Sequence, residues 1–129
     1  MRKHILLATL IGASVMGCAS NSDEQKQLEL LANNRASILA AELPIEAGPL
    51  SIMRASAKGS TIEIMMVYNE EQKGAKSVPQ VIANSKQYYC SNKDTKQNLA
   101  AGLSYRIKMR NSRGQLTADE FISEATCSN

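Results

Sequence analysis

The chain has 129 residues, of which 43% are hydrophobic and 21% charged, and its formal net charge is +3. This is an ordinary composition for one soluble domain, and the length is too short for two.

Arg2 and Lys3 lie in an N-terminal segment that is expected to be removed, and without them the chain has 13 basic and 12 acidic side chains. A net charge of +1 gives no support to nucleic-acid binding. The single histidine, His4, lies in the same segment, so the rest lacks the commonest general base and zinc ligand. We therefore expect that the protein is not an enzyme and has no catalytic residue. We also expect it to bind no metal, cofactor or small-molecule substrate.

Residues 1–17 have the three-part form of an export signal. A basic start precedes an apolar run over residues 5–16, which would rise only about 18 Å as a helix and so could not cross a hydrocarbon core of about 30 Å. Gly17-Cys18 at the end of the run resembles the lipobox of bacterial lipoproteins, in which the cysteine is acylated and becomes the first mature residue. An ordinary cleaved signal with a stray cysteine is the alternative. In such lipoproteins Ala19, rather than Asp, at the next position indicates the outer membrane.

The first half of the mature chain predicts a helix followed by a strand pair. Residues 18–23 are expected to form the acylated cysteine and a short tether, and residues 24–129 a single domain. Ser22 to Gln25 has the form of a capping box, and the helix should end near Glu42 because Pro44 disfavours helical geometry before it. Residues 43–49 are expected to be extended, with strands over 50–56 and 60–69.

The second half predicts two helices and a hairpin. A capping box starting at Ser77 opens a helix that runs to about Cys90, and a short helix follows over 95–101. Residues 103–110 alternate between apolar and polar side chains, residues 111–114 form a turn, and residues 115–124 return as the last strand. Phe121-Ile122 breaks the alternation of that strand, which indicates either a bulge or a strand covered on both faces. The fold class is α+β: an antiparallel four- to five-stranded sheet with helices packed on one face. An all-helical domain is the main structural competitor, and the alternation in 103–110 argues against it.

Two cysteines remain once Cys18 carries lipid. A disulfide between Cys90 and Cys127 would close a loop of about 37 residues and stabilise the domain by about 3–4 kcal/mol in the chain-entropy model. A free thiol is the competing interpretation, but no histidine is present to activate it. We therefore expect one disulfide.

A methionine-rich surface is the candidate binding site. Met65 and Val67 should lie on the sheet face opposite Ile62 and Ile64, with Met53 beside them, and Ile122 of the last strand is added to this candidate partner-binding set. Flexible thioethers suit a groove that receives an amphipathic helix. The alternative is that a helix of this domain covers them.

A basic row also follows the predicted hairpin, at Arg106, Lys108, Arg110 and Arg113. The simplest interpretation is a solvated sheet face that discourages edge-to-edge association. Contact with an acidic partner or with lipid headgroups is the alternative.

Four short stretches carry a resemblance to a known family: Leu43-Pro44-Ile45, Gln87-Tyr88-Tyr89-Cys90, Gly102-Leu103-Ser104-Tyr105 and Ala125-Thr126-Cys127. With the lipobox, their order resembles that of the α/β pilotin lipoproteins of bacterial type II secretion, the AspS or GspS-beta group. The resemblance runs from Cys18 to Cys127.

The resemblance implies a non-catalytic escort. Such pilotins bind a helical segment at the C-terminus of the secretin subunit and carry it to the outer membrane, where the domain faces the periplasm on its lipid anchor. The rival hypothesis is a lipid-anchored periplasmic inhibitor, for example of lysozyme, which should present a rigid polar loop rather than an apolar groove. A structural envelope lipoprotein is a third possibility.

Replacing the predicted acylation site, Cys18→Ala, should move the protein from the membrane pellet to the soluble periplasmic fraction, because no thiol remains to carry fatty chains. Fractionation and fatty-acid labelling measure this, with Ser20→Ala as a control that keeps the label. Unchanged membrane fractionation of Cys18→Ala would contradict the lipobox assignment.

Overall fold

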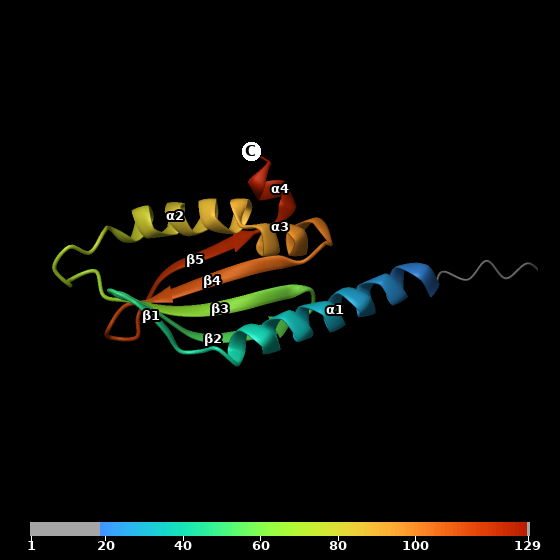
Figure 1. Cartoon of the computed structure of the whole chain (residues 1–129), viewed down its shortest axis with the longest axis horizontal. Helices are drawn as coiled ribbons and strands as arrows, with labels where there is room; N and C mark the ends of the chain where they lie inside the picture. The colour runs from blue at the N-terminus through green and yellow to red at the C-terminus, as the bar shows by residue number, and fades with distance from the viewer. Residues whose placement is uncertain (1–18, 129) are drawn as a thin grey trace, which may run out of the picture.

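The computed structural model describes residues 19–128, so the predicted signal peptide and Cys18 lie outside the described residues. Helices and strands follow one another in the order shown in Figure 1. Their bounds are α1 (Ala19–Ala40), β1 (Ile45–Ala47), β2 (Leu50–Lys58), β3 (Thr61–Tyr68), α2 (Val78–Ser91), α3 (Lys93–Ala100), β4 (Ser104–Arg110), β5 (Leu116–Ile122) and α4 (Glu124–Cys127).

The five strands form one sheet in the order β1-β2-β3-β4-β5. Neighbouring strands are antiparallel except β3 and β4, which are parallel. The predicted α+β class, with helices on one face of the sheet and one disulfide, is confirmed, but the sheet is mixed rather than wholly antiparallel. The reason is the crossover through α2 and α3, which carries the chain back to the end of the sheet where β3 starts.

Strand alternation places Ile62, Ile64 and Met66 of β3 on the same face as Tyr105, Ile107 and Met109 of β4. Ile62 is paired with Tyr105, Ile64 with Ile107 and Met66 with Met109, and every member of these pairs is buried. The largest fully buried side chains form the centre of this core: Ile62, Ile64, Leu103, Ile107, Met109 and Ile122. The residues between them point to the other face, which we call the open face.

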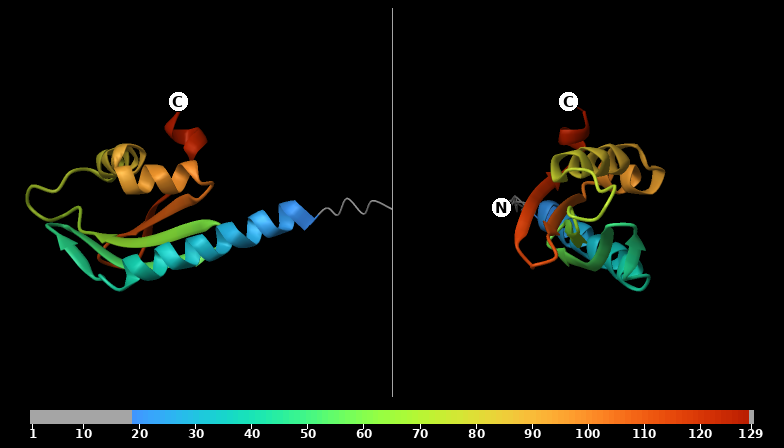
Figure 2. Two further views of the ribbon diagram at one scale, coloured as in Figure 1. Left: turned by 45° about the vertical axis from the view of Figure 1, so that its right-hand side comes forward. Right: turned by 90° about the vertical axis from the view of Figure 1, so that its left-hand side faces the viewer.

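Helices α1, α2 and α3 all contribute to the core on the same face of the sheet. Helix α1 lies along β2 and β3, whereas α2 contacts β5, so the helices cover opposite sides of that face (Figure 2). Ala32 and Ala36 are the buried residues of α1, and their small side chains let the helix lie close to the strands. The helix-covered face therefore has a line along its middle where α1 and the α2–α3 pair do not meet.

Several element boundaries differ from the prediction. Helix α1 begins at Ala19, so the residues expected to form a tether are helical. Residues 45–47 form the short edge strand β1 within the segment expected to be only extended. A bulge at Phe121, one of the two alternatives for that strand, is absent, whereas Met53 is the extra residue of a bulge in β2. Helix α4 was not predicted; Ser123 caps it through a reciprocal capping box with Thr126.

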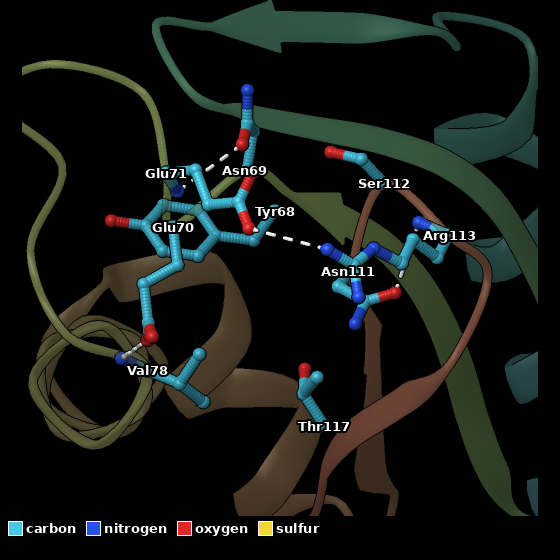
Figure 3. Close-up of a pocket in the computed structure, with 9 residues that line it drawn as sticks. All are labelled: Tyr68, Asn69, Glu70, Glu71, Val78, Asn111, Ser112, Arg113 and Thr117. Atoms are coloured by element: carbon cyan, nitrogen blue, oxygen red, sulfur yellow. Dashed lines mark hydrogen bonds and ion pairs between the residues drawn. The ribbon is translucent and has the colours of Figure 1, made fainter.

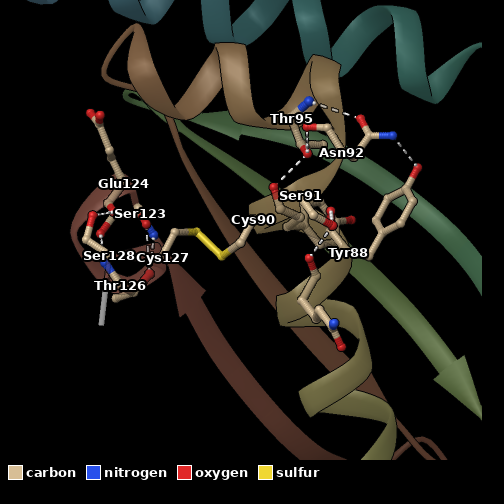
Figure 4. The surroundings of a disulfide bond; sticks show 12 residues. Tyr88, Cys90, Ser91, Asn92, Thr95, Ser123, Glu124, Thr126, Cys127 and Ser128 are labelled. Atoms are coloured by element: carbon tan, nitrogen blue, oxygen red, sulfur yellow. Dashed lines mark hydrogen bonds between the residues drawn. A yellow bond between two sulfur atoms is a disulfide. The ribbon is translucent and has the colours of Figure 1, made fainter.

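The predicted disulfide is present and joins α2 to α4. The Cα atoms of Cys90 and Cys127 lie 5.4 Å apart, and the bond connects the last turn of α2 to the chain that follows β5 (Figure 4). It thereby fastens the C-terminal end of the domain to the helical layer.

Reduction of this disulfide should lower the free energy of unfolding by about 3–4 kcal/mol and the thermal midpoint by about 10–15 °C, because 37 residues of enclosed chain regain freedom when unfolded. Circular dichroism melts with and without reductant measure the change. The Cys90→Ser/Cys127→Ser double variant should melt low in both conditions. A midpoint insensitive to reductant in the unsubstituted chain would refute the stabilising role.

Three tyrosines form an aromatic cluster beside the disulfide. The ring centroids of Tyr89 and Tyr105 lie 4.9 Å apart, and those of Tyr88 and Tyr89 lie 5.8 Å apart in an edge-to-face arrangement. Burial, together with the neighbouring Tyr105 and Tyr88, raises the pKa of Tyr89 well above its ordinary value. Burial also raises the pKa of Tyr105, against the opposing effect of a hydrogen bond from Asn98.

These raised pKa values predict alkaline sensitivity. The folded state favours the neutral phenols, so their contribution to stability is fully present below the unfolded pKa of about 10 and is lost as the pH rises above it. Urea unfolding at pH 8, 10 and 11 should show the free energy of unfolding falling only above about pH 10. Tyr89→Phe should flatten that fall, while Tyr88→Phe, whose ring is exposed, serves as control. An equal fall in all three proteins would contradict the assignment to Tyr89.

Candidate functional site

A groove of about 570 Å³ lies between α1 and the α2–α3 pair, and we call it the helix groove. Its floor is the sheet, and the two helical layers form its walls. The α1 wall consists of Arg35, Ile38, Leu39 and Glu42. The floor consists of Ile45, Ile52, Ile62, Ile64 and Tyr105. The α2–α3 wall consists of Tyr88, Tyr89, Asn92, Asp94, Thr95, Gln97 and Asn98.

Two large apolar side chains on opposite walls are exposed to solvent. Ile38 of α1 is 53% exposed and Tyr88 of α2 is 58% exposed, above a floor on which Ile62 and Ile64 are almost completely buried. Apolar surface of this kind, bordered by polar side chains, is typical of a site that accepts another apolar surface.

The corner between α2 and α3 is held by hydrogen bonds centred on Asn92 (Figure 4). Its side-chain oxygen accepts from the backbone N–H groups of Asp94 and Thr95, and its amide donates to the Tyr88 hydroxyl at 3.2 Å. The Thr95 hydroxyl donates to the Tyr89 carbonyl at 2.7 Å. The helix start at α3 and the orientation of the exposed Tyr88 ring are thus set by one residue.

One end of the helical layer is closed by contact between α1 and the turn that follows α3. Gly102 in that turn has a φ of 108°, and a Cβ atom at this position would lie 3.3 Å from the Leu28 side chain. Because a side chain there would press on α1 and strain the backbone, the turn depends on glycine. On the groove floor nearby, Asn98 donates a hydrogen bond of 2.8 Å to the Tyr105 hydroxyl.

A second, smaller pocket of about 160 Å³ lies at the other end of the sheet, between the β3–α2 loop and the β4–β5 hairpin (Figure 3). Its polar groups are largely used within the domain. The Tyr68 hydroxyl donates to the Lys76 carbonyl at 2.6 Å, Glu70 accepts from the Val78 N–H at 2.8 Å, and Glu71 lies 3.7 Å from Arg113. This pocket is too small and too polar to receive a helix.

The predicted methionine surface lies on the open face and is separate from the helix groove. Met53, in the β2 bulge, is 46% exposed, and Met65 and Val67 are half-buried. None of the three lines either pocket described above, and their role in binding a partner stays a prediction. Ile122 is fully buried in the core, and its prediction as a partner contact is wrong because no surface of it is accessible.

The basic row on the open face is largely paired within the sheet. Arg106 forms two hydrogen bonds of 2.8 Å with Asp119, which lower the pKa of that carboxyl. Lys108 and Lys58 lie 3.2 and 3.4 Å from Glu63. Burial acts to raise the pKa of Glu63, but the two lysines outweigh it and lower the pKa overall. These pairs favour the interpretation of a solvated face.

The groove residues could be identified only in part from the sequence. The apolar repeat of α1 includes Ile38 and Leu39, and periodicity alone assigns both to the buried stripe. In the structure, Ile38 lies at the edge of the stripe and faces the groove. Tyr88 and Tyr89 are likewise adjacent in the sequence, and the helical period alone does not decide which of them faces inward. The missing information is the spacing between helices, which no local pattern encodes.

Over residues 19–128, no helix is both long and apolar enough to cross a membrane. The same residues contain no group of three or more His, Cys, Asp or Glu side chains placed to bind a metal ion.

The chain is similar to known proteins over nearly its whole domain. The family model described as "Type II secretion system (T2SS) pilotin, S protein" matches residues 24–127. The solved pilotin AspS of Vibrio cholerae is 53% identical, with a TM-score of 0.78, over 84% of this chain and 99% of that chain. The pilotin EpsS of the Vibrio vulnificus type 2 secretion system is 48% identical, with a TM-score of 0.78, over 83% and 97%.

A more distant relative is Pilotin AspS 2 of Escherichia coli O78:H11, which is 20% identical over 129 residues, 98% of this chain and 93% of that protein. The resemblance inferred from the short sequence stretches is therefore confirmed. The chain belongs to the type II secretion system pilotin family.

Proposed function

We propose that this protein is an outer-membrane lipoprotein that binds the C-terminal helical segment of a type II secretion secretin in the helix groove and targets that subunit to the outer membrane for assembly. Membership of the pilotin family supports a secretin as the partner. The observation that carries the groove assignment is the pair of exposed apolar side chains, Ile38 and Tyr88, on facing walls.

The shape of the groove suits one side of a helix. Its walls are helices α1 and α2–α3, and a third helix between them could insert an apolar stripe against Ile62 and Ile64 while its polar side remained in water. The volume of about 570 Å³ accommodates several side chains rather than a whole helix, so the bound segment would rest in the groove without being enclosed. An inhibitor of an enzyme would instead be expected to present a rigid polar loop.

The lipid anchor supplies the destination. Acylation at Cys18 would attach fatty chains directly before α1, and the domain would face the periplasm from the outer membrane. In this division of roles the groove holds the secretin and the lipid determines where the complex goes, so no catalytic step is needed.

Ile38→Glu should weaken binding of a peptide spanning the C-terminal helix of a type II secretin about ten-fold or more, because a charge replaces apolar surface at the contact. Isothermal titration or fluorescence anisotropy measures the affinity. Leu30→Glu is the matched control: the same helix, and a side chain that is 69% exposed and does not line the groove.

Thermal melts should show that both variants stay folded, since each replaced side chain is already exposed. Met53→Glu tests the open face in the same assay and should leave the affinity unchanged. If Ile38→Glu binds as well as Leu30→Glu, the groove is not the binding site. If Met53→Glu alone weakens binding, the methionine surface predicted from the sequence is the site after all.

A further inference from the structure

Two opposite charges border the α1 wall of the helix groove without any partner among residues 22–128. Arg35 and Glu42 both line the groove and both are exposed. No hydrogen bond or ion pair joins either side chain to another described residue. By contrast, the charged side chains Arg106, Asp119, Lys108 and Glu63 on the open face are all paired.

The charge of Glu42 is not explained by the stability of the helix that it follows. Glu42 follows the C-terminal end of α1, where the helix dipole disfavours a carboxylate, and its backbone N–H still bonds to the Leu39 carbonyl of the last turn. Asp94, the third charge on the groove, differs in this respect, because it lies in the first turn of α3, where a carboxylate is favourable. A charge placed against local helix preference is a frequent mark of a functional position.

The spacing of the two residues matches the repeat of a helix. Arg35 and Glu42 are seven positions apart, which is about two helical turns, and Glu42 lies in the turn two residues beyond the end of α1. Arg35 lies toward the Tyr105 end of the groove, close enough to act on that hydroxyl, whereas Glu42 lies toward the Ile45–Ile52 end. A helix beside α1 would therefore meet Arg35 near one end and Glu42 near the other, while Asp94 of α3, which also acts on the Tyr105 hydroxyl, lies at the Arg35 end.

An apolar floor alone does not distinguish the two directions in which a helix can lie in the groove. Charges at the two ends do, because complementary charge pairs fix the register and reject the reverse orientation. We infer that Arg35 and Glu42 set the direction of the bound helix, and that this helix carries an acidic side chain opposite Arg35 and a basic one about two turns away, opposite Glu42. The inference rests on the proposed function, since it concerns the occupant of the same groove.

The test uses a peptide spanning the C-terminal helix of the type II secretin, and a second peptide in which its acidic and basic residues at this spacing are exchanged. Arg35→Glu and Glu42→Lys should each weaken binding of the first peptide about five-fold at low salt, and the loss should shrink at high salt. The double variant Arg35→Glu/Glu42→Lys should prefer the exchanged peptide. Lys26→Glu and Glu24→Lys are matched controls, because they make the same changes of charge on α1 outside the groove.

Each outcome decides the matter. Preference of the double variant for the exchanged peptide supports the inference. Affinities of Arg35→Glu and Glu42→Lys within two-fold of their controls would overturn it, as would a secretin helix with no acid and base at this spacing. These failures leave the groove assignment intact if Ile38→Glu still weakens binding relative to Leu30→Glu. Failure of the unsubstituted protein to bind the peptide at all would instead overturn the proposed function, and this inference with it.

Discussion

The parallel pairing of β3 with β4 is the constraint on which the rest of this structure depends. Two parallel neighbours need a crossover, and here the crossover is the α2–α3 pair. Because α2 and α3 follow β3 and return the chain to β4, they cover the β4–β5 side of the sheet, while α1 covers β2 and β3. The groove is the space left between these two helical layers, and residues of β1 to β4 form its floor.

The two faces of the sheet therefore have different characters. The helix-covered face carries the apolar core and the exposed Ile38 and Tyr88 along its groove. The open face carries Arg106 and Lys108 paired with acids, and its methionines lie among these pairs. A partner that buries apolar surface gains more from the first face, because the second would require its ion pairs to be broken or desolvated.

Much of the fold could be predicted from the sequence because the signals were local. The alternation in 103–110, the caps at Ser77 and the even pair of cysteines each correspond to a contact within one element or to one covalent bond. The direction of β4 relative to β3 could not be predicted, because alternation is the same in parallel and antiparallel strands. The position of the helix groove could not be predicted for a related reason: Met65 does face away from Ile64 as expected, but which face the helices would leave hollow depended on the crossover.

The helical start of α1 at Ala19 has a mechanical consequence. If fatty chains are attached at Cys18, no flexible linker separates them from the groove. Helix α1, with 22 residues and a length of about 33 Å, begins beside the attachment point and forms a wall of the groove at its other end. A change in the tilt of α1 relative to the bilayer would tilt the bound helical segment by the same amount. The orientation of a bound secretin subunit relative to the membrane would then be set by α1 and would not vary freely.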